Sequence, residues 1–83
     1  MFTIYSMNGC GYCDKVKELM SLTKQRFVVY TLDEHFTIEE FDGEFNTLQF
    51  PQVVADLPSG DRQHIGGAAE VAEYFKEHNL AAK

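Results

Sequence analysis

Basic residues are scarce in this chain of 83 residues: seven Lys and Arg stand against thirteen Asp and Glu, a formal net charge of −6. Proteins that bind nucleic acid rely on a basic surface that releases counterions, and anionic membranes attract basic segments. No hydrophobic run is long enough to cross a bilayer. These shortages argue against a nucleic-acid partner and against a membrane partner.

Cysteine is scarcer still, with two residues separated by two positions. Small secreted domains usually carry several disulfides, because their hydrophobic cores are thin. The N-terminus has neither the basic nor the apolar region of a secretory signal. We therefore expect a reducing, cytoplasmic location, in which a Cys-x-x-Cys pair indicates redox chemistry or half of a metal site.

Hydrophobic residues, in contrast, make up 45% of the chain and aromatic residues 13%. This composition is typical of a compact globular fold and too apolar for a disordered segment. The length predicts a single domain over residues 1–83.

Hydrophobic periodicity and turn residues predict seven elements in the order β-α-β-α-β-β-α. We expect strands over residues 2–6, 27–32, 52–57 and 62–65, and helices over 11–24, 37–48 and 68–79. The first two strands should be parallel with a right-handed crossover, and the second of them should be buried. The last two strands should form an antiparallel hairpin around the turn at residues 58–61. The prediction is an α/β fold, a four-stranded mixed sheet flanked by three helices.

Two of the helices show which side chains should face inward. Thr37 followed by Glu40 fits a capping box, and one face of the following helix would carry Ile38, Phe41, Phe45 and Leu48. In the last helix Val71, Ala72 and Phe75 are expected to point inward.

The cysteines, Cys10 and Cys13, lie where the first strand ends and the first helix begins. The first turn of a helix has unsatisfied N–H groups and a partial positive charge, which stabilise a thiolate at Cys10. Cys13, one turn later, could attack a mixed disulfide formed on Cys10. The spacing therefore predicts Cys10 as the nucleophile and Cys13 as the resolving thiol.

Two other interpretations of the pair remain open. Buried cysteines can act simply as small hydrophobic residues. A structural zinc site would need two more ligands, which only the histidines could readily supply. His35, His64 and His78 form no second paired unit, so we expect them to be surface or hairpin residues and predict no metal site.

Three separated motifs make the chain resemble the glutaredoxins, and especially the small glutaredoxins of tailed bacteriophages. They are Cys10-Gly11-Tyr12-Cys13, Phe50-Pro51-Gln52-Val53 and His64-Ile65-Gly66-Gly67, and they span almost the whole chain. The resemblance implies a thioredoxin-like fold and a cis peptide bond before Pro51. It also implies a glutathione site in which the Phe50 backbone pairs with the ligand and the Ala68 and Ala69 N–H groups bind its carboxylate. Tyr12, Pro51 and Gly67 would flank this site.

The chain departs from the family pattern at four positions. Met7 and Gln49 stand where many glutaredoxins have Lys and Thr, and Ala69 stands where they often have Ser or Asp. These changes bear on the affinity for glutathione. Gly11 replaces the common proline between the cysteines. Family members with such a residue sometimes hold a [2Fe–2S] cluster between two protomers, which here would use Cys10 as the ligand.

The resemblance thus implies a glutathione-linked thiol–disulfide oxidoreductase, a monomer that reduces protein disulfides and protein–glutathione mixed disulfides. An alternative is a dedicated electron donor to a ribonucleotide reductase, in the host cytoplasm if the chain is encoded by a phage. An iron–sulfur carrier is the alternative that is not an enzyme. An acidic stretch between Asp33 and Glu44 would be a solvated face or would steer basic partner proteins.

Overall fold

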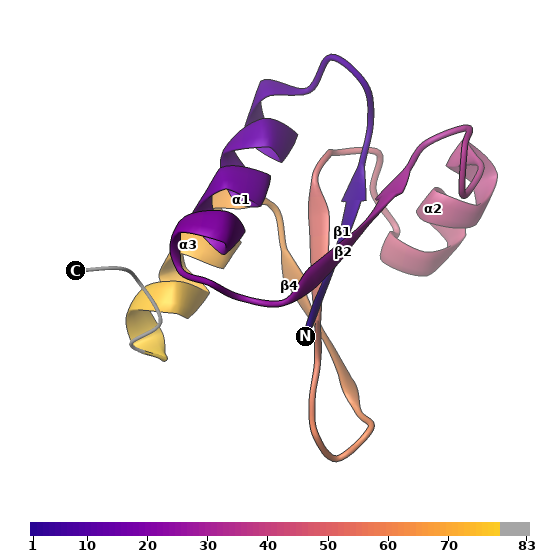
Figure 1. The fold of residues 1–83 in the computed structure, drawn as a ribbon. Coiled ribbons are helices and arrows are strands. Elements are labelled where there is room, and N and C mark those ends of the chain that lie inside the picture. Colours follow the sequence, from indigo (N-terminus) through magenta and orange to yellow (C-terminus); the bar gives the residue numbers. More distant parts are fainter. Residues whose placement is uncertain (79–83) are drawn as a thin grey trace.

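The computed structural model describes residues 1–78 and contains the seven expected elements in the expected order (Figure 1). The thioredoxin-like architecture is confirmed. The elements are β1 (Phe2–Ser6), α1 (Gly11–Leu22), β2 (Phe27–Thr31), α2 (Ile38–Phe45), β3 (Gln52–Asp56), β4 (Arg62–Gly66) and α3 (Ala68–Glu77).

The four strands form one mixed sheet in the order β2-β1-β3-β4. Strands β1 and β2 are parallel, with Phe2 opposite Phe27, and α1 makes the crossover between them. Strands β3 and β4 form the antiparallel hairpin, and β3 also pairs antiparallel with β1. The hairpin turn is closed by a hydrogen bond from the Leu57 N–H to the Asp61 carbonyl, 2.9 Å long. Gly60 adopts a positive φ of 92° there, which a residue without Cβ takes at no steric cost.

Helices α1 and α3 cover one face of the sheet (Figure 1). The core on this face combines alternate residues of the central strands with one stripe of each helix. It consists of Phe2, Ile4, Val16, Met20, Val53, Ala55, Val71 and Phe75. Complete burial of such side chains contributes about 1.5–3 kcal/mol each, so this core holds the two helices firmly on the sheet.

Helix α2 lies on the opposite side of the sheet from α1 and α3 (Figure 1). A second core, mainly aromatic, joins α2 to the sheet. Tyr5 alternates with Ile4 along β1 and so points to this face. Its ring lies 4.9 Å from the ring of Phe45 and 5.3 Å from that of Phe36, centroid to centroid. We call the rings of Tyr5, Tyr30, Phe36, Phe41, Phe45 and Phe50 the aromatic core.

The expectation that the second strand is buried is wrong. Strand β2 lies at an edge of the sheet, where Val28 is half-buried and Tyr30 is 41% exposed. Its apolar composition is typical of an interior strand, but the neighbours of a strand depend on the order of strands in the sheet. The hairpin adds its β3 strand to the other side of β1, and this places β1 and β3 at the centre.

Helix α2 begins as expected but ends earlier. The Thr37 Oγ1 accepts the Glu40 N–H at 3.2 Å, and Glu40 Oε1 accepts the Thr37 N–H at 2.8 Å, so the capping box is confirmed. The helix ends at Phe45 because Asn46 adopts a left-handed conformation, φ 55°, and its N–H closes the helix on the Asp42 carbonyl. Leu48 is therefore outside the helix, and it is 62% exposed rather than part of the inner face.

The other two helices differ from expectation at their C-terminal parts. Helix α1 ends at Leu22, since Lys24 takes a positive φ of 58°. Helix α3 ends at Glu77, and Asn79, to which we expected it to extend, lies outside the described residues. Ala72 is exposed instead of inward, because α3 meets the sheet through the stripe of Val71 and Phe75. No helix within residues 1–78 is long and apolar enough to cross a membrane.

Candidate functional site

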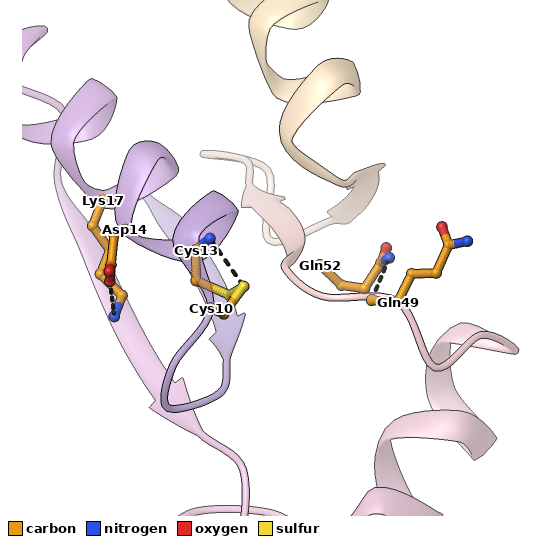
Figure 2. The surroundings of a disulfide bond; sticks show 6 residues. All are labelled: Cys10, Cys13, Asp14, Lys17, Gln49 and Gln52. Carbon is orange, nitrogen blue, oxygen red and sulfur yellow. Dashed lines mark hydrogen bonds and ion pairs between the residues drawn. A yellow bond between two sulfur atoms is a disulfide. The ribbon is translucent and has the colours of Figure 1, made fainter.

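The two cysteines lie at the N-terminal end of α1, joined in a disulfide with their Cα atoms 5.2 Å apart (Figure 2). Cys10 is the N-cap residue, with an extended backbone, and Cys13 lies in the first turn of the helix. The Cys13 N–H donates to the Cys10 Sγ over 3.1 Å. Because this N–H has no carbonyl partner within the helix, the Cys10 sulfur occupies the position of a capping oxygen.

The two sulfur-bearing side chains differ in exposure. Cys10 is half-buried, whereas Cys13 is 0% exposed and lies beneath the first turn of α1. Gly9, which precedes the pair, turns the chain out of the loop after β1 with a positive φ of 76°. An incoming thiol or disulfide can therefore reach Cys10 from solvent, whereas Cys13 is shielded from solvent and can react only with a group already at the site, such as Cys10.

Two lysines of α1 lie near the site, and each has a partner. The Lys15 Nζ lies 5.5 Å from the centroid of the Tyr12 ring, within the range of a cation–π interaction. The Lys17 Nζ lies 3.7 Å from the Asp14 carboxylate, an exposed pair of small energetic value. The Met7 side chain, three residues before Cys10, is exposed and carries no charge.

The second predicted motif lies just before β3. The Phe50–Pro51 peptide bond is cis, as the resemblance implied, and Pro51 is buried. The Phe50 ring stacks on Phe41 of the aromatic core, with centroids 4.2 Å apart and planes 9° apart. Through Phe50, the segment that leads to β3 is therefore attached to the aromatic core.

Hydrogen bonds of Gln52 hold the same segment. Its side-chain amide donates to the Gln49 carbonyl over 2.9 Å (Figure 2), and its oxygen lies 2.6 Å from the His64 Nε2. Since the Gln52 oxygen is an acceptor, His64 donates through Nε2. Gln52 therefore ties the segment before β3 to strand β4.

The third motif forms the start of α3. Gly67 is the N-cap, and its N–H donates to the Glu70 Oε1 over 2.8 Å. At Gly66, with φ 126°, a Cβ would lie 2.8 Å from the Glu70 Cγ, so only glycine fits there. The N–H groups of Ala68 and Ala69 follow in the first turn of the helix, next to the Glu70 carboxylate.

A groove of about 330 Å³ brings these motifs together. It contains all six of the non-cysteine residues that the resemblance implied, and three that it did not. The first six are Tyr12, Phe50, Pro51, Gly67, Ala68 and Ala69, and the other three are Gln49, Gln52 and Glu70. Tyr12 lies between the two cysteines in the chain, so the groove begins beside the disulfide.

All three additional residues lie in or near the predicted motifs, and Glu70 also fits the pattern of a helix start. An acidic residue three positions after an N-cap is typical of a helix start, and Glu70 follows Gly67 at that spacing. The place of Gln52 depends on contacts with Gln49 and with His64 on another strand. Local sequence patterns do not show such contacts.

The histidines have hydrogen-bond neighbours of their own. The His35 Nδ1 accepts the Thr31 N–H at 2.9 Å, and the His78 Nδ1 lies 3.0 Å from the Tyr74 carbonyl. Within the part of the chain that the structure describes, His, Cys, Asp and Glu side chains nowhere gather in threes that could hold a metal ion.

Comparison with known proteins relates this geometry to one family. The family model described as Glutaredoxin matches residues 2–57, from β1 through the cysteine pair and the cis-proline to the end of β3. The chain is also 32% identical to the glutaredoxin of Enterobacteria phage T4 over 91 aligned positions, which cover 92% of this chain and all of that protein.

Solved structures with the same fold are also glutaredoxins. A buckwheat glutaredoxin–glutathione complex is 25% identical, covers 95% of this chain and 71% of its own, and has a TM-score of 0.74. Glutaredoxin 1 from Francisella tularensis in complex with cacodylate, 24% identical over 95% of this chain and 94% of its own, has a TM-score of 0.69 and supports the fold. The chain therefore belongs to the glutaredoxin family of thiol–disulfide oxidoreductases.

Proposed function

We propose that this protein uses glutathione to reduce protein disulfides and protein–glutathione mixed disulfides, with Cys10 as nucleophile and Cys13 as resolving thiol. The observation that carries the proposal is the groove beside the disulfide, whose lining includes every residue that the family resemblance assigned to glutathione. A peptide-sized ligand in this groove would lie between the first turn of α1, the segment before β3 and the start of α3.

The difference in exposure supports the assignment of the two thiols. In the reduced protein, the half-buried Cys10 thiolate would attack one sulfur of a substrate disulfide and release the other as a thiol. The buried Cys13 would then attack the Cys10 sulfur, release the second substrate thiol and form the Cys10–Cys13 disulfide. Two electrons pass from the protein to the substrate in this sequence.

Glutathione would return those electrons in two steps. A first glutathione thiolate attacks the Cys10 sulfur, which forms a mixed disulfide and frees the Cys13 thiol. A second glutathione attacks the glutathione sulfur of this mixed disulfide, so that glutathione disulfide leaves and the Cys10 thiolate is restored. The hydrogen bond from the Cys13 N–H to the Cys10 Sγ supports this role, because it would stabilise the thiolate as the leaving group.

The proposed binding mode uses backbone groups at both ends of the groove. Phe50 precedes the ladder of β3, and its backbone would pair with the extended glutathione peptide. The Ala68 and Ala69 N–H groups at the start of α3 would bind the γ-glutamyl carboxylate. The Gly67 N–H already donates to Glu70, so it would not serve as a third donor. The buckwheat glutaredoxin, which was solved in complex with glutathione, supports a ligand of this kind.

The test compares glutathione with cysteinylglycine, which lacks the γ-glutamyl group, as reductants of the oxidised protein. Rates are measured at equal thiolate concentrations, and dithiothreitol serves as the control that needs no groove. We expect reduction by glutathione to saturate and to be faster than reduction by cysteinylglycine. Equal, non-saturating rates with both thiols would contradict a glutathione site and leave only general thiol exchange.

A second candidate is a dedicated electron donor to a ribonucleotide reductase, which the relationship to a phage glutaredoxin supports. Both candidates use the same cysteine chemistry, so they differ in the protein that receives the electrons. Turnover with a ribonucleotide reductase is compared with turnover of a glutathionylated peptide at equal concentrations. A large preference for the reductase would favour the dedicated donor.

The third candidate, an iron–sulfur carrier, can be judged by the available ligands. A [2Fe–2S] cluster is usually held by four thiolates, and the only partly exposed cysteine of this chain is Cys10. Cys10 thus fits one ligand position, and the remaining sulfurs would come from a second chain and from glutathione. Anaerobic purification followed by a visible spectrum and iron analysis distinguishes this candidate from the redox enzyme.

A further inference from the structure

The aromatic core leaves a second cavity, of about 470 Å³, on the face of the sheet away from α1 and α3. Its walls come from three parts of the chain. Tyr5 of β1 and Tyr30 of β2 lie on the sheet side, His35 and Phe36 in the connection to α2, and Glu40, Phe41 and Glu44 on α2 itself. The cavity shares no lining residue with the groove beside the cysteines.

Four of the seven residues that line this cavity are Tyr or Phe. The Tyr5 ring lies 5.7 Å from the Tyr30 ring and 5.3 Å from the Phe36 ring, and Phe36 and Phe41 are buried. Tyr30 is 41% exposed, so its ring forms part of the open side. The faces of aromatic rings carry partial negative charge and attract cations.

The charged groups at this cavity are carboxylates. Glu40 and Glu44 are four residues apart on α2, which places them on the same side of the helix, and both line the cavity. Within residues 1–78 the ion pairs are Lys17–Asp14 and Arg62–Asp56, so neither glutamate has a cationic partner there.

Most of the cavity lining comes from residues 30–44, and this stretch contains no Lys or Arg. Its Asp33, Glu34, Glu39 and Asp42 add negative charge to that of the two glutamates. Arg62 lies on β4. A hydrogen bond with the Tyr5 side chain is the main cause that raises the pKa of Arg62, and a hydrogen bond with Asp56 raises it further. Arg62 lines a smaller neighbouring pocket together with Glu44, but its guanidinium is paired with the Asp56 carboxylate at 3.0 Å and does not line the cavity itself.

We propose that this cavity binds an arginine side chain of a protein partner. A guanidinium is planar, stacks on aromatic rings and can donate to two carboxylates, so it matches both the Tyr5 and Tyr30 rings and the Glu40 and Glu44 carboxylates. A second copy of this chain is a poor occupant, because each copy carries a net charge of −6.

The position of the cavity relative to the cysteines favours a redox partner as the source of the arginine. Phe41 forms a wall of the cavity, and the Phe50 ring stacked on it at 4.2 Å lines the groove beside the disulfide. A protein whose disulfide reaches Cys10 could therefore place an arginine in the cavity while its backbone crosses Phe50. The cavity would then select among protein substrates without taking part in thiol exchange.

The test is a titration of the 15N-labelled oxidised protein with the peptide acetyl-Gly-Gly-Arg-Gly-Gly-amide, followed by amide chemical shifts at low ionic strength. The comparison peptide has citrulline in place of arginine, which keeps the shape and removes the charge. We expect saturable shifts that centre on the residues lining the cavity. The citrulline peptide should bind about threefold to tenfold more weakly.

Two variants and a matched control locate the site. Glu44→Gln and Tyr30→Leu should each weaken binding of the arginine peptide by about threefold to tenfold. Glu39→Gln removes the same charge from the same helix but at a residue that does not line the cavity, so its affinity should stay within about twofold of wild type. The amide spectra also show whether each variant is folded.

Three outcomes would overturn the proposal: equal affinity for both peptides, shifts that centre outside the cavity, or equal losses in Glu39→Gln and Glu44→Gln, which would indicate general electrostatic attraction. Because binding is measured without turnover, these outcomes are independent of the reductase assay. A protein inactive with glutathione could still bind the arginine peptide, and an active one could fail to bind it.

Discussion

The groove beside the cysteines is bounded by the N-terminal ends of two helices, and these ends are capped by different groups. At α1 the Cys13 N–H donates to the Cys10 sulfur over 3.1 Å, whereas at α3 the Gly67 N–H donates to the Glu70 carboxylate over 2.8 Å. Both acceptors satisfy an N–H group that the helix itself leaves without a carbonyl partner.

The two caps differ in what can happen to their charge. The charge of the Cys10 sulfur changes between disulfide and thiolate, so the N-terminus of α1 stabilises one state of a reacting group. The Glu70 carboxylate is part of the protein in every redox state, and it places a negative charge where the γ-glutamyl carboxylate is proposed to bind. The positive helix end therefore supports reaction at α1, whereas at α3 the Glu70 carboxylate offsets it and would weaken the binding of a second anion.

The largest expected effect on activity comes from Cys10→Ser, which replaces the reactive sulfur at the N-cap of α1 with an unreactive hydroxyl. A serine oxygen accepts the Cys13 N–H well, so under reducing conditions the free energy of unfolding should stay within about 1 kcal/mol of wild type. Disulfide reductase activity should be lost, because the hydroxyl is not a nucleophile in thiol exchange. Activity is measured in a glutathione-coupled assay and stability by urea unfolding. Retained activity would exclude Cys10 as the nucleophile.

Cys13→Ser keeps the Cys10 sulfur at the N-cap of α1 and removes only the buried resolving thiol. Reduction of protein disulfides should be lost, since nothing resolves the mixed disulfide on Cys10. Reduction of a glutathionylated peptide should persist, because external glutathione can resolve that intermediate. The two substrates are assayed side by side with the same preparation. A variant that loses both activities would contradict the monothiol route.

At α3, Glu70→Gln separates the hydrogen bond of the cap from its negative charge. The glutamine oxygen can still accept the Gly67 N–H, but the negative charge at the helix end is removed. If the γ-glutamyl carboxylate binds there, the KM for a glutathionylated peptide should fall by about twofold to fivefold, with little change in kcat. Glu73→Gln is the control, because Glu73 lies on the same helix and does not line the groove. Equal changes in both variants would show an effect of net charge alone.

The smallest effect on activity is expected at α2, whose cap lies outside the groove. Thr37→Ala removes the oxygen that accepts the Glu40 N–H, so the free energy of unfolding should fall by about 1 kcal/mol. Turnover of the glutathionylated peptide should not change. Chemical unfolding and the coupled assay check the two expectations separately. A loss of turnover at unchanged stability would contradict this expectation and show that Thr37 affects the active site directly.

Features that depend on near neighbours in the chain could be predicted well. The capping box of Thr37 and Glu40, the hairpin turn near Gly60 and the first strand over residues 2–6 are all confirmed. Each depends on dihedral preferences or hydrogen bonds between residues a few positions apart. The position of the cysteine pair at the start of α1 could be predicted for the same reason.

The errors involve packing at a distance. The apolar composition of residues 27–32 predicted a buried strand, but β2 became an edge strand when β3 paired with the other side of β1. The end of α2 is a local exception: Leu48 continues the helical pattern, but Asn46 takes a left-handed conformation and ends the helix before it. Gln52 joins the groove through a hydrogen bond with His64 on β4, a contact that no local pattern contains.

Local sequence patterns were enough to predict where the helices and strands begin, the capping box of α2 and the two sulfurs one helical turn apart. These properties follow from interactions within a few residues. Long-range packing sets the remaining features: which strands are central, which motifs meet in the groove and where the aromatic core leaves a cavity. These depend on how distant segments pack, and the free energy of that packing belongs to the whole sheet and its helices rather than to any one segment.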